Sequence, residues 1–473
     1  MCKDLTMNLL SIDLFQSKYT KAVGLYTIGN IFNRAIALLL LPVFTKLLST
    51  TSYGIVSTYT SWVSIITVIV SLQLNLTLRS AWTDKRHELN SYISSVTTLM
   101  ILMAIIQLVI CVPLVPVLFK SVPLILVVFC IIQSFSDSVI NMETQREMMA
   151  MEYVKRTLLL SIPNLTAAIL GIVVLYIYPD SQYFGRIVPS VCVSLLAASI
   201  LLHLFYKKGK KIVDKQNWKY GLLYSLPLIF HGLASTVLSG LDFTMITSYK
   251  SAAETGIYSV AYTLGMAVGV ITSSMESVWI PWFTEHMNKN QKNTVNEIAQ
   301  KYIGVTTLLC VCVMLCLPEV LMLFTDCSYW AGVSLIPPIV FASFIIFLYS
   351  ISVDVEYYYK KTKIIAINTI IAAVVNVVLN FIFIPKYGAI AAAYTTVASY
   401  FVSFVIHYNY AHHVDHELFP FKIYLVPFLA AIIGVIASSS LSLWYYRWGL
   451  TIIIITIGFI YYKKHLSVLL KGD

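Results

Sequence analysis

Long apolar stretches alternate with short polar segments along the whole chain. Each stretch is about 20 residues or longer, the length that an α-helix needs to cross about 30 Å of hydrocarbon at about 1.5 Å per residue. The predicted transmembrane helices are 22–45, 55–81, 92–119, 122–142, 157–178, 187–206, 220–248, 256–283, 302–325, 333–357, 364–384, 389–408, 423–441 and 445–462. The pattern therefore predicts an all-α integral membrane protein with about 14 transmembrane helices.

Composition supports a membrane protein over a soluble one. Hydrophobic residues make up 58% of the 473 residues, charged residues make up 11%, and the mean hydropathy is +0.80. A soluble protein has about 25% charged residues, so this chain has too few charges to cover soluble domains. Residues 1–21 are polar and lead into a full-length apolar stretch without a small-residue cleavage site. This start predicts a retained first span rather than a cleaved signal peptide.

The basic residues lie mostly on one predicted side of the membrane. With both termini in the cytoplasm, the inner loops and tails hold about 24 Lys and Arg, against about 6 in the outer loops. Such a bias predicts that both termini and the 207–219 loop are cytoplasmic. The one-sided distribution also accounts for the formal net charge of +10. We therefore expect no nucleic-acid partner.

Two short sequence matches indicate an internal repeat. GIVS at 54–57 matches GIYS at 256–259, an offset of 202, and KRT at 155–157 matches KKT at 360–362, an offset of 205. Both copies begin on the cytoplasmic side, so the repeats are parallel, an arrangement that transporters use with the binding site between two bundles. A duplication without a transport role is the alternative.

The repeat predicts three parts of the chain. Residues 1–219 are expected to form an N-terminal six-helix bundle, and residues 220–420 a C-terminal six-helix bundle. Residues 421–473 are expected to add two transmembrane helices and a cytoplasmic tail.

Arg34 is the first candidate for substrate binding. It lies 13 residues beyond Lys21, hence about 18–20 Å into the bilayer, where inserting an Arg costs at least about 2.5–3.5 kcal/mol. Asn30 and Asn33 make the same segment polar, so we expect Arg34 to contact an anionic group, with a structural ion pair as the alternative. Arg79 lies close to the inner interface, where it either contacts the substrate or extends to the headgroups.

Two acidic residues within spans are candidates for ion coupling. Asp242 lies in the outer part of the seventh predicted span, and Glu276 in the inner half of the eighth. Intramembrane carboxylates are costly and are often functional. Each could bind a coupling cation or pair with Arg34, and a hydrogen bond or salt bridge between helices is the alternative.

Two other polar groups are expected to have no site role. Asp354 and Glu356 precede Lys360 and Lys361, which suggests a charge cluster at a helix end rather than a metal site. The HHVDH sequence at 412–416 is expected to be a solvated loop rather than a metal site.

Motifs of covalent catalysis and of nucleotide hydrolysis are missing from the sequence. It contains no GxxxxGK[ST], HExxH or GxSxG. We therefore expect no enzyme activity, no catalytic residues, no cofactor and no bound metal. Any driving force must come from ion gradients or from consumption of the product.

Several segments resemble one family. These are PVFTKLLSTTSYG at 42–54, YSLPL at 224–228 followed by Asp242, TGIYSVAY at 255–262, and the stretch from KKT to IPKYGA at 360–389. Over nearly the whole chain, they are similar to the polysaccharide flippases of the multidrug/oligosaccharidyl-lipid/polysaccharide exporter superfamily. In many members an Arg follows the seventh-span Asp, whereas here Phe243 follows Asp242. Any role that depends on an Asp-Arg pair is therefore in doubt.

The resemblance implies a substrate, partners and a location. The substrate would be an undecaprenyl-diphosphate-linked oligosaccharide, moved across the bacterial plasma (inner) membrane for O-antigen, capsule or exopolysaccharide synthesis. Partners would be this lipid-linked oligosaccharide, membrane lipids, and a polysaccharide polymerase with other assembly proteins. Arg34, Arg79, Asn30 and Asn33 would contact the diphosphate.

Three other functions remain open at this point. A cation-coupled multidrug exporter and a lipid II flippase belong to the same superfamily, and the residues alone do not exclude either. A membrane polysaccharide polymerase or ligase would act on the same lipid. Such enzymes usually have a sizeable outer loop, and no outer loop here is expected to exceed about 15 residues.

Overall fold

The computed structural model describes residues 36, 38–118, 122–441 and 443–469. The regular elements in these ranges are all helices, which confirms the predicted all-α class. The chain divides into two compact units. Unit 1 comprises 1–40 and 59–233, and unit 2 comprises 41–58 and 234–473.

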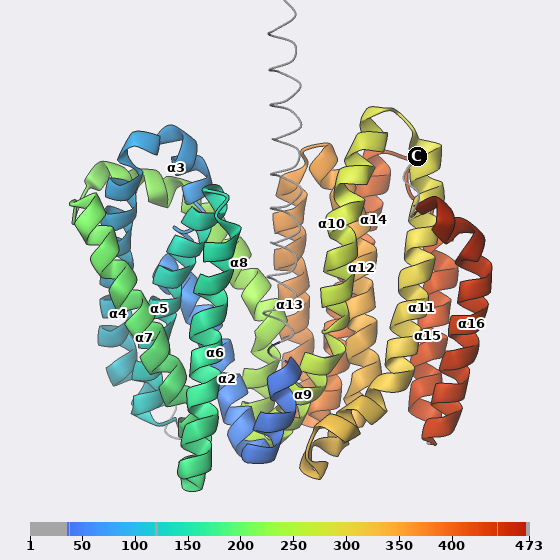
Figure 1. Ribbon diagram of the computed structural model, residues 1–473, viewed down its shortest axis with the longest axis horizontal. Coiled ribbons are helices and arrows are strands. Elements are labelled where there is room, and N and C mark those ends of the chain that lie inside the picture. The colour runs from blue at the N-terminus through green and yellow to red at the C-terminus, as the bar shows by residue number, and fades with distance from the viewer. Residues whose placement is uncertain (1–35, 37, 119–121, 442, 470–473) are drawn as a thin grey trace, which may run out of the picture. The chain divides into compact units, whose positions relative to one another are not determined.

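Unit 1 is built from the helices of the first half of the chain. They are the later part of α2 (Thr50–Ser71), α3 (Leu78–Asp84), η1 (Arg86–Glu88), α4 (Leu89–Leu118), α5 (Leu124–Met149), α6 (Tyr153–Ile177), η2 (Pro179–Ser181), α7 (Gln182–Gly209) and the first part of α8 (Lys215–Tyr249). Helix α7 packs against α4, α5 and α6 (Figure 1).

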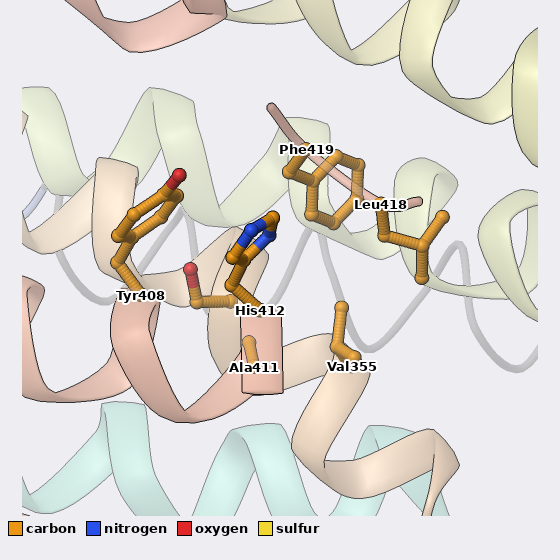
Figure 2. A pocket seen from close by; sticks show the side chains of 7 residues that line it. Val355, Tyr408, Ala411, His412, Leu418 and Phe419 are labelled. Atoms are coloured by element: carbon orange, nitrogen blue, oxygen red, sulfur yellow. The ribbon is translucent and has the colours of Figure 1, made fainter. Parts of the chain in front are cut away.

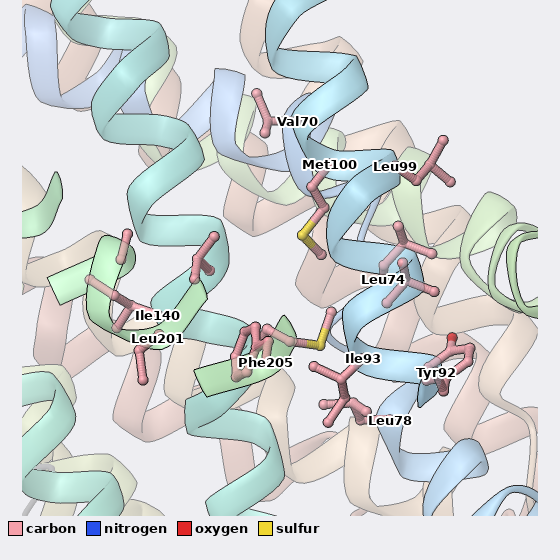
Figure 3. Close-up of a cluster of buried hydrophobic side chains, with 14 of the residues drawn as sticks. Val70, Leu74, Leu78, Tyr92, Ile93, Leu99, Met100, Ile140, Leu201 and Phe205 are labelled. Carbon is pink, nitrogen blue, oxygen red and sulfur yellow. The ribbon is translucent and has the colours of Figure 1, made fainter. Parts of the chain in front are cut away.

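The core of unit 1 lies among α4, α5 and α7. Met100 on α4 and Val139 on α5 are fully buried, and Phe205 on α7 is 3% exposed. Figure 3 shows Met100, Ile140 and Phe205 within this cluster, with Tyr92 nearer the start of α4. Outward-facing residues such as Val109 on α4 are exposed and apolar, as lipid contact requires.

Unit 2 contains the remaining helices. They are the first part of α2, the later part of α8, α9 (Ala252–Gly265), α10 (Val268–Asn288), α11 (Lys292–Phe324), η3 (Cys327–Leu335), α12 (Ile336–Tyr358), α13 (Thr362–Tyr387), α14 (Ala389–Val414), α15 (Lys422–Ser440) and α16 (Trp444–Leu469). Helices α15 and α16 pack against α11 (Figure 1). An ion pair between Arg447 of α16 and Glu319 of α11 joins two of these helices.

The two units repeat one packing pattern. Helix α7 packs against α5 and α6 in unit 1, and α14 packs against α12 and α13 in unit 2. The chain enters α6 and α13 in the same way, through a residue with positive φ two positions before the helix. These residues are Met151 (φ 60°) and Lys360 (φ 58°). The two helices whose starts share the KRT/KKT match therefore occupy equivalent places.

The other repeat match lies at a reciprocal contact within unit 2. A Cβ at Gly54 would lie 1.7 Å from the carbonyl oxygen of Ala252, and a Cβ at Gly256 would lie 2.0 Å from that of Thr50. Ser57 donates a hydrogen bond to Ser259 over 2.8 Å, again across 202 positions. Each segment thus contacts the matching segment of the other repeat copy. Only glycine permits this approach of the two backbones.

The predicted spans agree with the structure in number but not in all details. Within the described ranges, 12 helices are long and apolar enough to cross a membrane, and the shorter apolar helices Leu38–Leu47 and Trp444–Ile460 bring the number to the predicted 14. Two predicted spans contain a helix break that the sequence did not show. The helix of the predicted span at 55–81 breaks after α2, because Leu72 and Gln73 adopt positive φ. The Ser71 hydroxyl there accepts a hydrogen bond from the backbone N–H of Gln73.

The predicted span at 256–283 is also interrupted. Helix α9 begins earlier, at Ala252, and ends at Gly265, and α10 begins at Val268. Between them, Ala267 donates its backbone N–H to Leu264, three residues back, instead of four. A continuous apolar run gives no signal for such a change of hydrogen-bond pattern.

Candidate functional site

Asp242 is the centre of a buried polar cluster in unit 2. Its carboxylate lies on α8 and is 2% exposed. Asn380 of α13 donates to Oδ1 over 2.6 Å, while Tyr258 of α9 and Thr396 of α14 donate to Oδ2 over 3.0 and 2.9 Å. Four helices therefore contribute to one site, from sequence positions as far apart as 242 and 396.

Further polar groups surround these donors. Asn380 also donates to Asn376 Oδ1 over 3.0 Å, and Thr395 donates to Asn380 Oδ1. Asn376 is fully buried, and its Nδ2 has no hydrogen-bond partner among the described residues. The cluster is thus rich in oxygen atoms and incompletely hydrogen-bonded, which is unusual for a buried polar network.

The charge of Asp242 is not balanced by a basic side chain in the part of the chain that the structure describes. Its three partners are neutral donors. A carboxylate, amide oxygens and hydroxyls suit a proton or a small hard cation, which prefers oxygen ligands. Phe243, the next residue, packs its ring against Tyr258 and Tyr262, at 5.5 Å between ring centroids in each case.

Glu276 lies in a second polar region, on α10. Ser350 of α12 donates to its Oε1 over 2.6 Å, and the side chain is partly buried. Asp354, one turn further along α12, accepts from the indole nitrogen of Trp279 over 3.0 Å. Neither of these carboxylates has an ion-pair partner among the described residues. The prediction that Asp354 belongs to a charge cluster with Lys360 and Lys361 at the helix end was therefore wrong.

The same prediction for Glu356 was also wrong. It is fully buried and pairs with His407 of α14, whose Nδ1 lies 2.9 Å from each carboxylate oxygen. The expected partners, Lys360 and Lys361, lie beyond the end of α12, and α12 carries Glu356 on its buried face. His407 gave a weak signal, since a lone histidine inside a span resembles any other buried polar residue.

The expectation of a solvated loop at 412–416 was wrong in part, because His412 and His413 lie in the last turn of α14 and Asp415 is 6% exposed. In the described part of the chain no group of three or more His, Cys, Asp or Glu residues is placed to bind a metal. Asp415 instead accepts from Lys292 over 2.9 Å and from Tyr359 over 2.6 Å. Burial alone would raise the pKa of Asp415, but the hydrogen bonds from Tyr359 and Lys292 outweigh it and hold the pKa below its usual range.

Of the four predicted phosphate-contacting residues, only Arg79 lies within the described residues. Arg34, Asn30 and Asn33 lie outside the described residues. Arg79 is exposed on α3, near its first turn. The structure therefore leaves these four assignments as proposals.

Asp137 in unit 1 is a carboxylate that the sequence reasoning missed. It lies in the middle of α5, is partly buried, and follows Gln133 by one helical turn. Gln133 accepts a hydrogen bond from the Tyr59 hydroxyl over 2.8 Å, so this part of α5 is polar. An acidic residue within the predicted span at 122–142 was the available signal.

Comparison with known proteins identifies the family. The family model described as "Polysaccharide biosynthesis protein" matches residues 19–287, more than half of the chain. The chain belongs to this polysaccharide biosynthesis protein family. It is similar to Lsg locus putative protein 1 of Haemophilus influenzae, with 24% identity over 414 residues that cover 82% of this chain and 98% of that protein.

Two solved structures share the fold of this family member. The lipid II flippase MurJ in an inward closed conformation matches with a TM-score of 0.66 and 16% identity, over 93% of this chain and 99% of that one. A multidrug resistance MATE family transporter of the MOP superfamily, facing inward, matches with a TM-score of 0.59 and 14% identity, over 87% and 96%. The shared fold and the 12 candidate spans among the described residues make it a multi-pass membrane protein.

Proposed function

We propose that this protein moves undecaprenyl-diphosphate-linked oligosaccharide units from the inner to the outer leaflet of a bacterial plasma membrane by alternating access. The observation that carries the proposal is the combination of a polysaccharide biosynthesis family with the fold of two membrane transporters. Transport, rather than covalent chemistry, is the activity that both findings support. The product would feed O-antigen, capsule or exopolysaccharide assembly.

The chemistry of this substrate explains the need for a protein. Its sugars and diphosphate cannot cross hydrocarbon unaided, whereas its polyprenyl tail can stay in lipid. We assign diphosphate binding to Arg34 and Arg79, with Asn30 and Asn33 nearby, because an Arg fork gives two charge-assisted hydrogen bonds to a phosphate. Outward movement of two negative charges gains up to about 4–5 kcal/mol per 100 mV, inside negative.

The buried Asp242 cluster supports coupling to a cation. We assign Asp242 as the site that binds a proton or a small hard cation, since its hydrogen-bond partners are neutral and oxygen ligands surround it. Glu276, held by Ser350, is assigned as a second ion-coupling residue. Return of the cation down its gradient would then reset the transporter for another substrate.

A lipid II flippase is the second candidate function. The shared fold with the lipid II flippase MurJ motivates this candidate. Both functions use a polyprenyl diphosphate, so they differ in the sugar portion. Growth of a strain depleted of its own lipid II flippase would identify this alternative.

The proposal also names a location and partners. The protein would lie in the plasma membrane with both termini in the cytoplasm, where the basic residues of its loops would lie. Its partners would be the lipid-linked oligosaccharide, membrane lipids, and a polysaccharide polymerase with other assembly proteins.

Deletion and complementation in the source bacterium test the function. Deletion should stop surface polysaccharide, and lipid-linked repeat units should accumulate on the inner leaflet. The intact gene should restore export, whereas a gene for Arg34→Ala should not, with normal protein levels in the membrane. Normal surface polysaccharide in the deletion strain would contradict the proposal.

A further inference from the structure

A groove lies between α13 and α14 in unit 2, and we refer to it as the α13–α14 groove. It is lined mainly by Leu379, Phe383 and Tyr387 of α13 and by Ile390, Tyr394 and Ala398 of α14. Its volume is about 330 Å³, within the range of about 300–1,000 Å³ that is typical of ligand pockets. By contrast, the hollow around Tyr408, His412 and Phe419 has no room for a water molecule (Figure 2). The α13–α14 groove is therefore large enough to hold part of a ligand.

The lining of the groove is apolar and belongs to two predicted spans. Phe383, Tyr387 and Tyr394 are 39%, 63% and 52% exposed, so the groove is open along one side. Leu379 and Tyr394 lie in the outer halves of the predicted spans at 364–384 and 389–408. An apolar groove at this depth is filled by hydrocarbon chains rather than by water, because it offers water almost no hydrogen-bond partners.

Two lysines lie at the outer end of the α13–α14 groove. Lys386 directly precedes Tyr387, and Nζ of Lys250 donates a hydrogen bond to the carbonyl oxygen of Lys386 over 3.2 Å. Both side chains are exposed, and neither forms an ion pair with a described residue. Glu254, a carboxylate at this end, accepts the backbone N–H of Ala389 instead. The groove thus carries positive charge where the headgroup of an outer-leaflet lipid would lie.

The length of the groove matches the hydrocarbon of one leaflet. Leu379 precedes Lys386 by seven residues on α13, hence it lies about 10 Å deeper by helical rise. The hydrocarbon of one leaflet is about 15 Å thick, half of the bilayer value of about 30 Å. A lipid with its headgroup at the two lysines would therefore lay about two thirds of the depth of one chain along the groove.

One side chain of the groove lining also belongs to the Asp242 cluster. Thr395, which is 5% exposed, lines the groove and donates its hydroxyl to Asn380 Oδ1. Asn380 in turn donates to Asp242 Oδ1 over 2.6 Å. Water in the groove would compete for the Thr395 hydroxyl, whereas a hydrocarbon chain leaves its hydrogen bond to Asn380 intact. An occupied groove therefore protects the hydrogen bonds of the cluster.

We propose that the α13–α14 groove binds one acyl chain of an anionic phospholipid from the outer leaflet, with Lys250 and Lys386 on the lipid phosphate. An anionic headgroup on an apolar chain complements both the lysines and the groove lining. The bound lipid acts as a structural ligand that keeps water away from Thr395, and so from the Asp242 cluster. This role is independent of which substrate the protein transports.

Crosslinking by a photoreactive phospholipid tests the site. The full-length protein is reconstituted in phosphatidylethanolamine liposomes that contain a small amount of phosphatidylglycerol with a diazirine on one acyl chain. Crosslinked peptides are quantified by mass spectrometry after digestion with pepsin, so that substitutions of lysine do not change the cleavage sites. Crosslinks should concentrate in residues 379–398, and unlabelled phosphatidylglycerol should compete for them more strongly than unlabelled phosphatidylcholine.

Lys250→Gln and Lys386→Gln test the contact with the headgroup. Each should reduce crosslinking of the phosphatidylglycerol probe in residues 379–398 about fivefold, the effect of one basic residue near a membrane surface on an anionic lipid. Crosslinking of a phosphatidylethanolamine probe with the same diazirine chain should not change. Lys46→Gln is the matched control, because Lys46 is another exposed lysine of the predicted outer side.

Ala398→Phe tests the groove by filling it. Ala398 is partly exposed, so a larger side chain can extend into the groove, and crosslinking of both probes in residues 379–398 should be lost. Ala430→Phe, at a partly exposed position of α15, is the matched control and should have no effect. If Ala398→Phe does not accumulate, Leu379→Trp fills the same groove from α13.

Equal crosslinking by the two probes, without competition by phosphatidylglycerol, would overturn the proposal and leave nonspecific contact with lipid. An equal effect of the lysine substitutions on both probes would contradict recognition of the anionic headgroup. Stronger competition by undecaprenyl phosphate than by phosphatidylglycerol would also overturn the proposal, because the groove would then bind a polyprenyl lipid.

Discussion

Asp242 is a carboxylate held inside a membrane protein by neutral donors from three other helices. Tyr258, Asn380 and Thr396 satisfy its oxygens, and the sequence could not have named these partners from spacing. The sequence did identify Asp242 as a candidate for ion coupling, since an acidic residue within an apolar span is rare. Glu356 and Asp354 were misjudged, because only the orientation of α12 decides that they are buried.

Replacement of Asp242 by Asn tests the cation role at this residue. Asn is nearly isosteric, and the hydroxyls of Tyr258 and Thr396 can turn to accept from its amide, so folding should persist. Loss of the negative charge should reduce polysaccharide export at least about tenfold, which corresponds to about 1.4 kcal/mol of lost coupling. Export and membrane protein levels are measured in the complemented deletion strain. Asp180→Asn, at an exposed position, is the matched control.

Unchanged export by Asp242→Asn would remove Asp242 from the coupling mechanism. Reduced export together with low protein levels would instead assign the residue a structural role.

Asp415 provides a pH-dependent prediction outside the spans. Its pKa is lowered in the folded protein, because the hydrogen bonds from Tyr359 and Lys292 outweigh the effect of burial. A lowered carboxyl pKa stabilises the fold above the unfolded pKa, and this contribution disappears as the pH falls through the folded value. Asp415→Asn should therefore cost about 1–3 kcal/mol near pH 7 and progressively less below about pH 4.

Thermal unfolding of the detergent-solubilised protein, followed by intrinsic fluorescence, measures this difference. Asp326→Asn, at an exposed carboxylate that caps η3, is the control for a loop carboxylate. An equal loss of stability for Asp415→Asn at pH 7 and at acidic pH would contradict the ionic explanation.

At the scale of helices, the start of α14 shows why one segment of the family resemblance is specific. Gly388 has φ 65° and ψ −141°, a conformation that is essentially limited to glycine. Glu254 accepts the backbone N–H of Ala389 over 2.6 Å, so a carboxylate lies at the N-terminus of this helix. A Cβ at Gly388 would lie 2.0 Å from Glu254 Oε1.

Gly388→Ala should therefore destabilise the protein by at least about 1–3 kcal/mol, through backbone strain and displacement of Glu254. The measurement is the midpoint of thermal unfolding in detergent. Gly269→Ala is the matched control, because its Cβ would meet nothing closer than 3.9 Å, and Ala favours a helix. If both substitutions gave the same midpoint, the special role of Gly388 would be refuted.

The hydrophobic pattern predicted the helices well, because a helix that crosses a membrane must be long and apolar. It missed the breaks at Leu72–Gln73 and at Met266–Ala267, which depend on local hydrogen bonds within apolar sequence. It also could not show that residues 41–58 pack in unit 2, since this depends on contact between distant helices. The repeat could be recognised in the sequence, because the GIVS and GIYS copies retain the glycine and serine residues that contact each other.

At the scale of the whole molecule, we propose that the two repeats rock about a central cavity. In this proposal the contact between the two repeat copies at Gly54 and Gly256, which lies inside unit 2, opens once per cycle. Ser57 and Ser259 lie at this contact with their hydroxyl oxygens 2.8 Å apart.

A disulfide between Ser57→Cys and Ser259→Cys tests this movement. The short distance between the two side chains should allow rapid oxidation, and the bond should stop export until a reductant is added. Each single cysteine variant is the control, because it retains the native cysteines but cannot form this bond. Full export by the oxidised double variant would show that the two segments stay together throughout transport.

The central claim is that the protein moves a lipid-linked oligosaccharide across a bilayer. The most direct measurement is translocation of a fluorescent undecaprenyl-diphosphate-linked oligosaccharide in liposomes that contain only the purified protein. Probe in the outer leaflet is bleached by an impermeant reductant, so that movement between leaflets appears as additional loss of fluorescence.

The account predicts that liposomes with the intact protein lose nearly all the fluorescence, whereas empty liposomes lose about half. Arg34→Lys should retain part of this activity, and Arg34→Ala should behave as empty liposomes do, because Lys keeps the charge but lacks the fork that binds the diphosphate. Retention of half of the fluorescence with the intact, folded protein would contradict the account.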